Sequence, residues 1–74
     1  MDREQLTEHL AQAERHIEQS YEHIARQSEL VTRLQRDGHE TSEAKRLLAE
    51  FEELLKIHIA GRDRLREELA RSQK

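Results

Sequence analysis

The sequence predicts an all-α fold: a two-helix antiparallel coiled-coil hairpin that dimerises into a four-helix bundle. Its 74 residues are 39% charged, contain no proline and only two glycines, and favour long helices. Apolar residues recur in alternating steps of four and three along both halves of the chain, as in coiled coils. Turn-forming residues gather once, around Gly38. We therefore expect a single hairpin over residues 1–74, with a helix over about 2–37, a turn over about 38–41 and a helix over about 42–71.

Composition excludes several classes of site and partner. The absence of cysteine rules out disulfides and thiolate metal sites. No apolar run approaches the roughly 20 residues of a membrane span, and the first residues lack the apolar core of a secretory signal. With 13 basic and 16 acidic residues and no basic stripe, binding to nucleic acid is not expected. We expect a cytoplasmic protein that contacts neither membrane nor nucleic acid.

The first helix carries two interleaved rows of residues that should face the second helix. One row is Leu10, Ile17, Ile24 and Val31, and its companion row is Leu6, Ala13, Ser20, Gln27 and Leu34. Together they form a coiled-coil seam. Ser20 and Gln27 interrupt it, which indicates either a loosely packed, partly solvated layer or a polar layer that fixes register or oligomeric state.

A second seven-residue series, beside the seam and in line with Leu30, consists of His9, His16 and His23. Successive members lie about 10 Å apart along a helix axis, so they cannot bind one metal ion within a single helix. They can act as amphipathic flanking residues, as a pH-sensitive helix contact, or as metal ligands completed by another helix. Protonation of all five histidines would move the formal charge from −3 to +2.

The turn should combine a helix stop with a helix start. Gly38 can adopt the left-handed conformation that ends a helix. Thr41 or Ser42 can cap the next helix with its side chain, and Glu43 places a negative charge in the first turn.

The second helix should present its own seam to the first. Its members are Ala44, Leu48, Phe51, Leu55, His58, Arg62, Leu65 and Leu69. Pairing residue i with residue 78 − i about the turn places His58 beside Ser20, which predicts a shared polar layer. His58 is then a core histidine bonded to Ser20 or to backbone, or a buried imidazole whose protonation loosens the layer. Gly61 marks either a close helix approach or a flexible point.

Two helices cannot enclose a core, and apolar residues extend beyond both seams. These additional residues are Leu30, Leu47, Leu54, Ile57 and Ile59. Domains of this size seldom fold without a disulfide, a metal or a partner chain. The simplest closed arrangement is an antiparallel four-helix bundle made from two chains. A compact hairpin and a domain-swapped pair with one continuous helix through the turn both satisfy this pattern.

Several stretches also resemble short uncharacterised helical-hairpin proteins of alphaproteobacteria. The resemblance rests on residues 13–17 and 24–27, on Asp37-Gly38-His39-Glu40-Thr41, on Ala44, Leu47, Leu48 and Phe51-Glu52, and ends at the His58 and 62–65 region. It implies a natural bacterial cytoplasmic protein, without an established activity.

The chain lacks a cysteine nucleophile, a glycine-rich phosphate loop and a zinc-protease motif, so we expect no enzyme, no catalytic residue, no cofactor and no metal site. The leading prediction is a self-associating interaction or regulatory module, and another helical protein is a further possible partner. The predicted interaction seam consists of Leu10, Ile17, Ile24, Val31, Leu48, Phe51, Leu55, Leu65 and Leu69. The alternative is a small pH- or metal-responsive binding protein, for which the candidate residues are Ser20, His58, His16 and His23.

Overall fold

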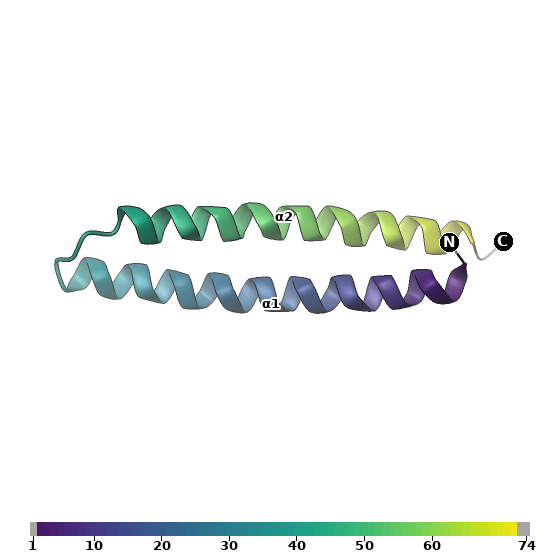
Figure 1. Ribbon diagram of the computed structural model, residues 1–74, viewed down its shortest axis with the longest axis horizontal. Helices are drawn as coiled ribbons and strands as arrows, with labels where there is room; N and C mark the ends of the chain where they lie inside the picture. The colour runs from purple at the N-terminus through teal and green to yellow at the C-terminus, as the bar shows by residue number, and fades with distance from the viewer. Residues whose placement is uncertain (1, 73–74) are drawn as a thin grey trace.

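The computed structural model describes residues 2–72 and shows two long antiparallel helices, α1 (Arg3–Arg36) and α2 (Ser42–Arg71), joined by a short connection (Figure 1). The predicted all-α helical hairpin is confirmed, and residues 2–72 contain no strand. The molecule measures 58 × 14 × 13 Å, and its radius of gyration is 16.9 Å. A compact domain of this length has a radius of gyration of about 11 Å. The hairpin is therefore a rod with a large surface for its mass.

The α1 helix begins with a reciprocal cap. The Gln5 backbone N–H donates to the Asp2 carboxylate at 2.8 Å, and the Asp2 N–H donates to the Gln5 side-chain oxygen at 3.3 Å. Two of the first free N–H groups thereby gain partners.

The same helix ends in a Schellman motif. Gly38 has φ +75°, which confirms the predicted left-handed glycine. Its N–H donates to the Gln35 carbonyl at 3.2 Å, and the His39 N–H donates to the Leu34 carbonyl at 2.9 Å. A residue with a Cβ would be strained at this φ, so Gly38 determines where the chain reverses.

The start of α2 differs from expectation. Thr41 occupies the N-cap position but makes no side-chain hydrogen bond to the helix. The carboxylate of Glu40 accepts the Ser42 N–H at 2.7 Å and also the Ser42 hydroxyl. These two bonds, the hydroxyl first, hold the pKa of Glu40 below its ordinary value because they stabilise the charged carboxylate. The prediction of a Thr41 or Ser42 side-chain cap was wrong, because Glu40 supplies the acceptor.

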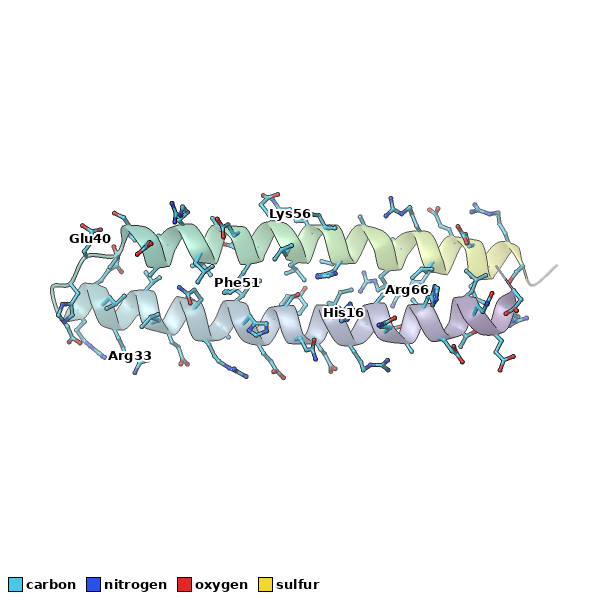
Figure 2. The ribbon with its side chains drawn as sticks, viewed as in Figure 1. His16, Arg33, Glu40, Phe51, Lys56 and Arg66 are labelled. Atoms are coloured by element: carbon cyan, nitrogen blue, oxygen red, sulfur yellow. The ribbon has the colours of Figure 1, made fainter. Side chains whose placement is uncertain are left out.

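The residues covered by helix packing follow the predicted rows. The nine predicted seam positions of α1 are the only α1 residues that are buried or half-buried, and the eight predicted positions of α2 are all half-buried. Among residues 2–72 only Leu6, Ile17 and Val31 are buried, at 3%, 6% and 8% exposure, and α2 contributes no buried residue. Figure 2 shows the side chains on both helices, with Phe51 directed between the helices and Arg33 and Lys56 directed outward. A single helix–helix contact thus gives a thin, open-sided core.

The register of the two helices is about one turn away from the predicted one. The His16 ring lies against His58 and the His23 ring against Phe51, whereas pairing i with 78 − i places His16 beside Arg62. The connection runs back alongside the end of α1 before α2 starts (Figure 1), so the facing ends of the helices are not level. His58 therefore meets His16 and not Ser20.

Gly61 lies inside α2 without a packing role within the hairpin. A Cβ built at this position meets no atom within 4 Å. The close helix approach considered for Gly61 is therefore absent from the hairpin.

Candidate functional site

Most exposed apolar side chains gather on one side of the rod. Of the five exposed large hydrophobic residues in the described range 2–72, four lie there, namely Leu30, Leu47, Leu54 and Ile57, with exposures of 37%, 41%, 48% and 63%. They line three shallow grooves between the helices, of about 430, 370 and 390 Å³. We call this surface the histidine–leucine face, defined by His16, His23 and Leu30 on α1 and by Leu47, Leu54 and Ile57 on α2.

The seven-residue spacing of the chain explains this surface. Residues seven apart return to the same side of a helix. His16, His23 and Leu30 therefore form one line beside the α1 seam, and Leu47 and Leu54 form the corresponding line beside the α2 seam. Since the helices are antiparallel, the two lines flank the same side of the interface and form a continuous surface.

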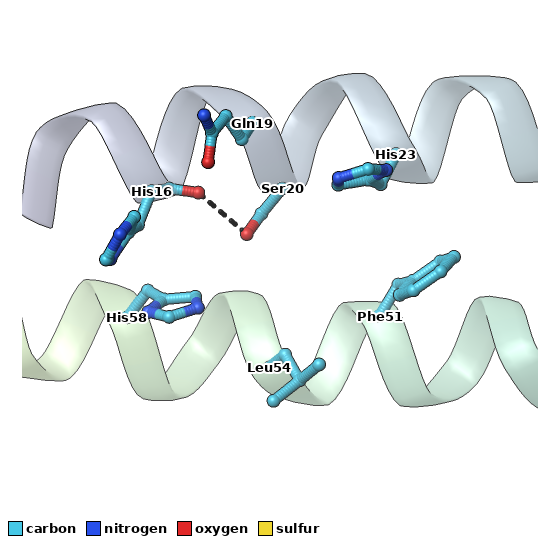
Figure 3. Close-up of a pocket in the computed structure, with 7 residues that line it drawn as sticks. All are labelled: His16, Gln19, Ser20, His23, Phe51, Leu54 and His58. Carbon is cyan, nitrogen blue, oxygen red and sulfur yellow. Dashed lines mark hydrogen bonds between the residues drawn. The ribbon is translucent and has the colours of Figure 1, made fainter.

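The middle groove contains a pair of histidines from different helices. The ring centroids of His16 and His58 are 5.5 Å apart and the rings are tilted by 54° (Figure 3). His16 is exposed and His58 is half-buried. Both rings also line the next groove, on the side away from the turn, with Arg64 and Glu68. The two imidazoles are thus accessible from the histidine–leucine face.

His23 is engaged differently. Its ring stacks on Phe51 with the centroids 5.7 Å apart and an interplanar angle of 29° (Figure 3). This contact covers part of the apolar Phe51 ring, which is the flanking role considered for the histidine series. His9 and His39 are exposed and lie outside the middle groove.

Ser20 does not form the predicted polar pair with His58. Its hydroxyl donates to the His16 carbonyl of the same helix at 2.9 Å, as helical serines commonly do. Within residues 2–72 no hydrogen bond joins Ser20 to His58, although both line the middle groove. The pairing failed because it depended on a register that the connection does not permit.

Gln27, the other polar seam residue, links the two helices. Its side-chain N–H donates to the Ala44 carbonyl at 3.0 Å in a partly buried position. The bond joins a side chain of α1 to the backbone of α2, so it forms only where Gln27 lies within side-chain reach of the Ala44 carbonyl. Gln27 is therefore hydrogen-bonded across the helix interface, as expected of a polar seam residue that fixes register.

The remaining predicted interaction residues lie along the hairpin interface. Ile17 and Val31 are buried, and the half-buried members are Leu10, Ile24, Leu48, Phe51, Leu55, Leu65 and Leu69. They are therefore largely occupied in holding α1 against α2. The apolar surface that remains exposed consists of the flanking residues Leu30, Leu47, Leu54 and Ile57. In the sequence these residues are the apolar positions beyond the seam.

The opposite side of the hairpin is more polar. Its groove is lined by Glu14, Arg15, Glu18 and Arg62 together with Ile17. Among the residues described, Tyr21 is the one large exposed hydrophobic residue on the flank away from His23, with 56% exposure. The two sides of the rod therefore differ in chemistry, and only one presents a continuous apolar surface.

Residues 2–72 hold no group of three or more histidines and carboxylates placed to bind one metal ion within a single chain. Neither helix has a segment both long and apolar enough to cross a bilayer.

Comparisons with models of protein families, with curated proteins and with solved structures gave no match. The resemblance to short alphaproteobacterial proteins stays a prediction.

Proposed function

We propose that this protein is a non-enzymatic helical hairpin that dimerises through its histidine–leucine face into a four-helix bundle and serves as a cytoplasmic interaction module. One observation carries the proposal: in the part of the chain that the structure describes, four of the five exposed large hydrophobic side chains lie on a single side of the rod. Apolar patches gathered on one surface commonly mark protein–protein contacts.

The surface area supports a partner of substantial size. The chain exposes 5815 Å² for a mass of 8.8 kDa. A folded monomer of this mass typically exposes about 4,800 Å². The excess, on the order of 1,000 Å², is comparable with the roughly 800 Å² that each partner contributes to a standard protein interface.

A second copy of the same chain is the occupant that this surface fits best. A two-fold axis along the rod would place the α1 half of one histidine–leucine face over the α2 half of the other. Leu30 of each copy then meets Leu47 of the other, since these residues line the same groove near the turn. Each α2, which has no buried residue in the hairpin, gains a second neighbour. The four helices enclose a shared core, as in other antiparallel bundles.

Sedimentation equilibrium over a hundredfold range of concentration, with a chelator present, tests the proposal. The expected mass is twice 8.8 kDa, falling toward 8.8 kDa on dilution. A mass of 8.8 kDa at every concentration, with high helicity by circular dichroism, would contradict self-association. A helical partner protein would then be the remaining occupant of the face.

The His16–His58 pair favours a second candidate function, a response to pH. The residues that line the middle groove are His16, Gln19, Ser20, His23, Phe51, Leu54 and His58, and none of them is acidic. Arg64 and Glu68 are the charged groups facing the pair from the adjoining groove. Two protonated imidazoles covered by a second chain would repel each other, and Glu68 is the only carboxylate of residues 2–72 that lines either groove.

This second candidate predicts a dimer at pH 8 that dissociates toward pH 5. The measurement is mass and helicity across that range for the natural chain and for a His16→Gln, His58→Gln double variant, which should lose the response. A dimer of unchanged mass from pH 8 to pH 5 would remove the pH-responsive function while leaving dimerisation intact.

A further inference from the structure

We propose that His16 and His58 form half of a transition-metal site that a second copy of the chain completes, so that one zinc ion bridges two hairpins. This inference rests on the proposed dimerisation through the histidine–leucine face. It assigns to that face a ligand of defined chemistry, a borderline-soft divalent cation bound by imidazole nitrogens.

The spacing of the two rings suits a shared ion. Zinc–nitrogen bonds are about 2.0–2.1 Å, so two imidazoles on one tetrahedral ion have ring centroids roughly 5 Å apart. The centroids of His16 and His58 are 5.5 Å apart, and the 54° tilt keeps the rings out of a parallel stack. Small side-chain rotations suffice to direct one nitrogen of each ring at a common point.

The surroundings of the pair leave the ring nitrogens free to bind. Within residues 2–72 neither ring takes part in an aromatic stack with an apolar side chain, in contrast to His23 on Phe51. The Ser20 hydroxyl, which the sequence placed beside His58, donates instead to the His16 carbonyl. The two histidines come from different helices, and the packing of α1 on α2 therefore holds them together before a metal arrives.

A single hairpin supplies too few ligands. Structural zinc sites use four protein ligands, and residues 2–72 of one chain offer no group of three candidate side chains. A two-fold axis along the rod keeps every residue level with its counterpart in the second copy. Both His16–His58 pairs then lie at one height on facing surfaces, and four imidazoles surround one point.

The experiment is a titration of the purified full-length chain with zinc chloride at pH 7.5, followed by calorimetry and by sedimentation. The expected result is one ion per two chains and a dimer that persists at dilutions at which the chelated protein dissociates. His16→Ala and His58→Ala should each weaken zinc binding at least about tenfold, because each removes two of four ligands. Circular dichroism verifies that the variants keep their helicity, as expected for one exposed and one half-buried residue.

His9→Ala and His39→Ala are matched controls, since each removes a histidine outside the middle groove. Both should retain the stoichiometry and affinity of the natural chain. Zinc binding that survives in His16→Ala and His58→Ala, or one ion bound per monomer, would overturn the bridged site. If the protein dimerises in the presence of a chelator but binds no added zinc, the bridged site is overturned and dimerisation stands. If the protein with chelator is monomeric at every concentration, the proposed function itself is contradicted.

Discussion

Replacing Leu54 by glutamine should weaken dimerisation while leaving the hairpin almost unchanged. Leu54 lies in the middle of the histidine–leucine face and is 48% exposed in the single hairpin. Glutamine is a good helix former of similar length, so the substitution removes apolar contact without disturbing α2.

The size of the effect follows from the exposed half of the side chain. Full burial of a leucine contributes about 1.5–3 kcal/mol, so covering the remaining half contributes about 0.7–1.5 kcal/mol. A symmetric dimer contains the residue twice, which gives about 1.5–3 kcal/mol per dimer, or a dissociation constant raised roughly 10- to 150-fold.

The assay is sedimentation equilibrium of the natural chain, Leu54→Gln and Tyr21→Gln under the same conditions. Tyr21 is the control because it is also a large, exposed hydrophobic residue, at 56% exposure, but lies on the opposite flank. We expect its replacement to change the dissociation constant less than twofold. Equal weakening by both variants, or none by Leu54→Gln, would refute the assignment of the interface to the histidine–leucine face.

Four further predictions concern the hairpin itself. Ile17→Ala truncates a side chain that is only 6% exposed, so the free energy of unfolding measured by urea denaturation should fall by about 2–4 kcal/mol. A loss below about 1 kcal/mol would mean that Ile17 does not belong to the core. Gln27→Ala deletes the hydrogen bond to the Ala44 carbonyl and should lower the free energy of unfolding by about 0.5–1 kcal/mol. An unchanged midpoint of urea denaturation would show that this bond contributes no stability. Gly61→Ala should raise the free energy of unfolding by up to about 1 kcal/mol in calorimetry, because a Cβ has open space there, and destabilisation would indicate a contact from a second chain. The pKa of Glu40 is lower in the folded chain than its ordinary value of 4.5, so this carboxylate contributes stability that is fully present above pH 4.5. That contribution is lost as the pH falls through the folded-state pKa. In thermal melts over this pH interval, the melting temperature of Glu40→Gln should therefore fall less than that of the natural chain.

The periodic residues made most of the fold predictable. Leu6, Ile17 and Val31 belong to rows spaced by four and three, and these rows are the covered ones. Such a pattern determines which side of a helix avoids water, whatever it packs against. The same reasoning identified Leu30, Leu47 and Leu54 as apolar residues in excess of what one helix pair can cover.

The contacts of the candidate site were less predictable. The contact between His16 and His58 depends on the height of α2 relative to α1. Symmetric pairing about the turn placed His58 one helical turn away from His16. The spacing of the residues makes the two observed contacts mutually consistent: His16 and His23 are seven apart, as are Phe51 and His58, so either contact implies the other. This equal spacing does not by itself determine the register of α2 along α1.

By itself, the sequence determined two helices, the seam that joins them and the point of reversal at Gly38, because helical periodicity and the left-handed conformation of glycine are local properties. Only the tertiary structure decided which residues of α2 meet which residues of α1. The Schellman motif and the connection that runs back alongside α1 set that register, and the hydrogen bond from Gln27 to the Ala44 carbonyl forms within it. The histidine pair exists because of this offset, since a shift of one helical turn would separate His16 from His58 by about 5 Å along the rod.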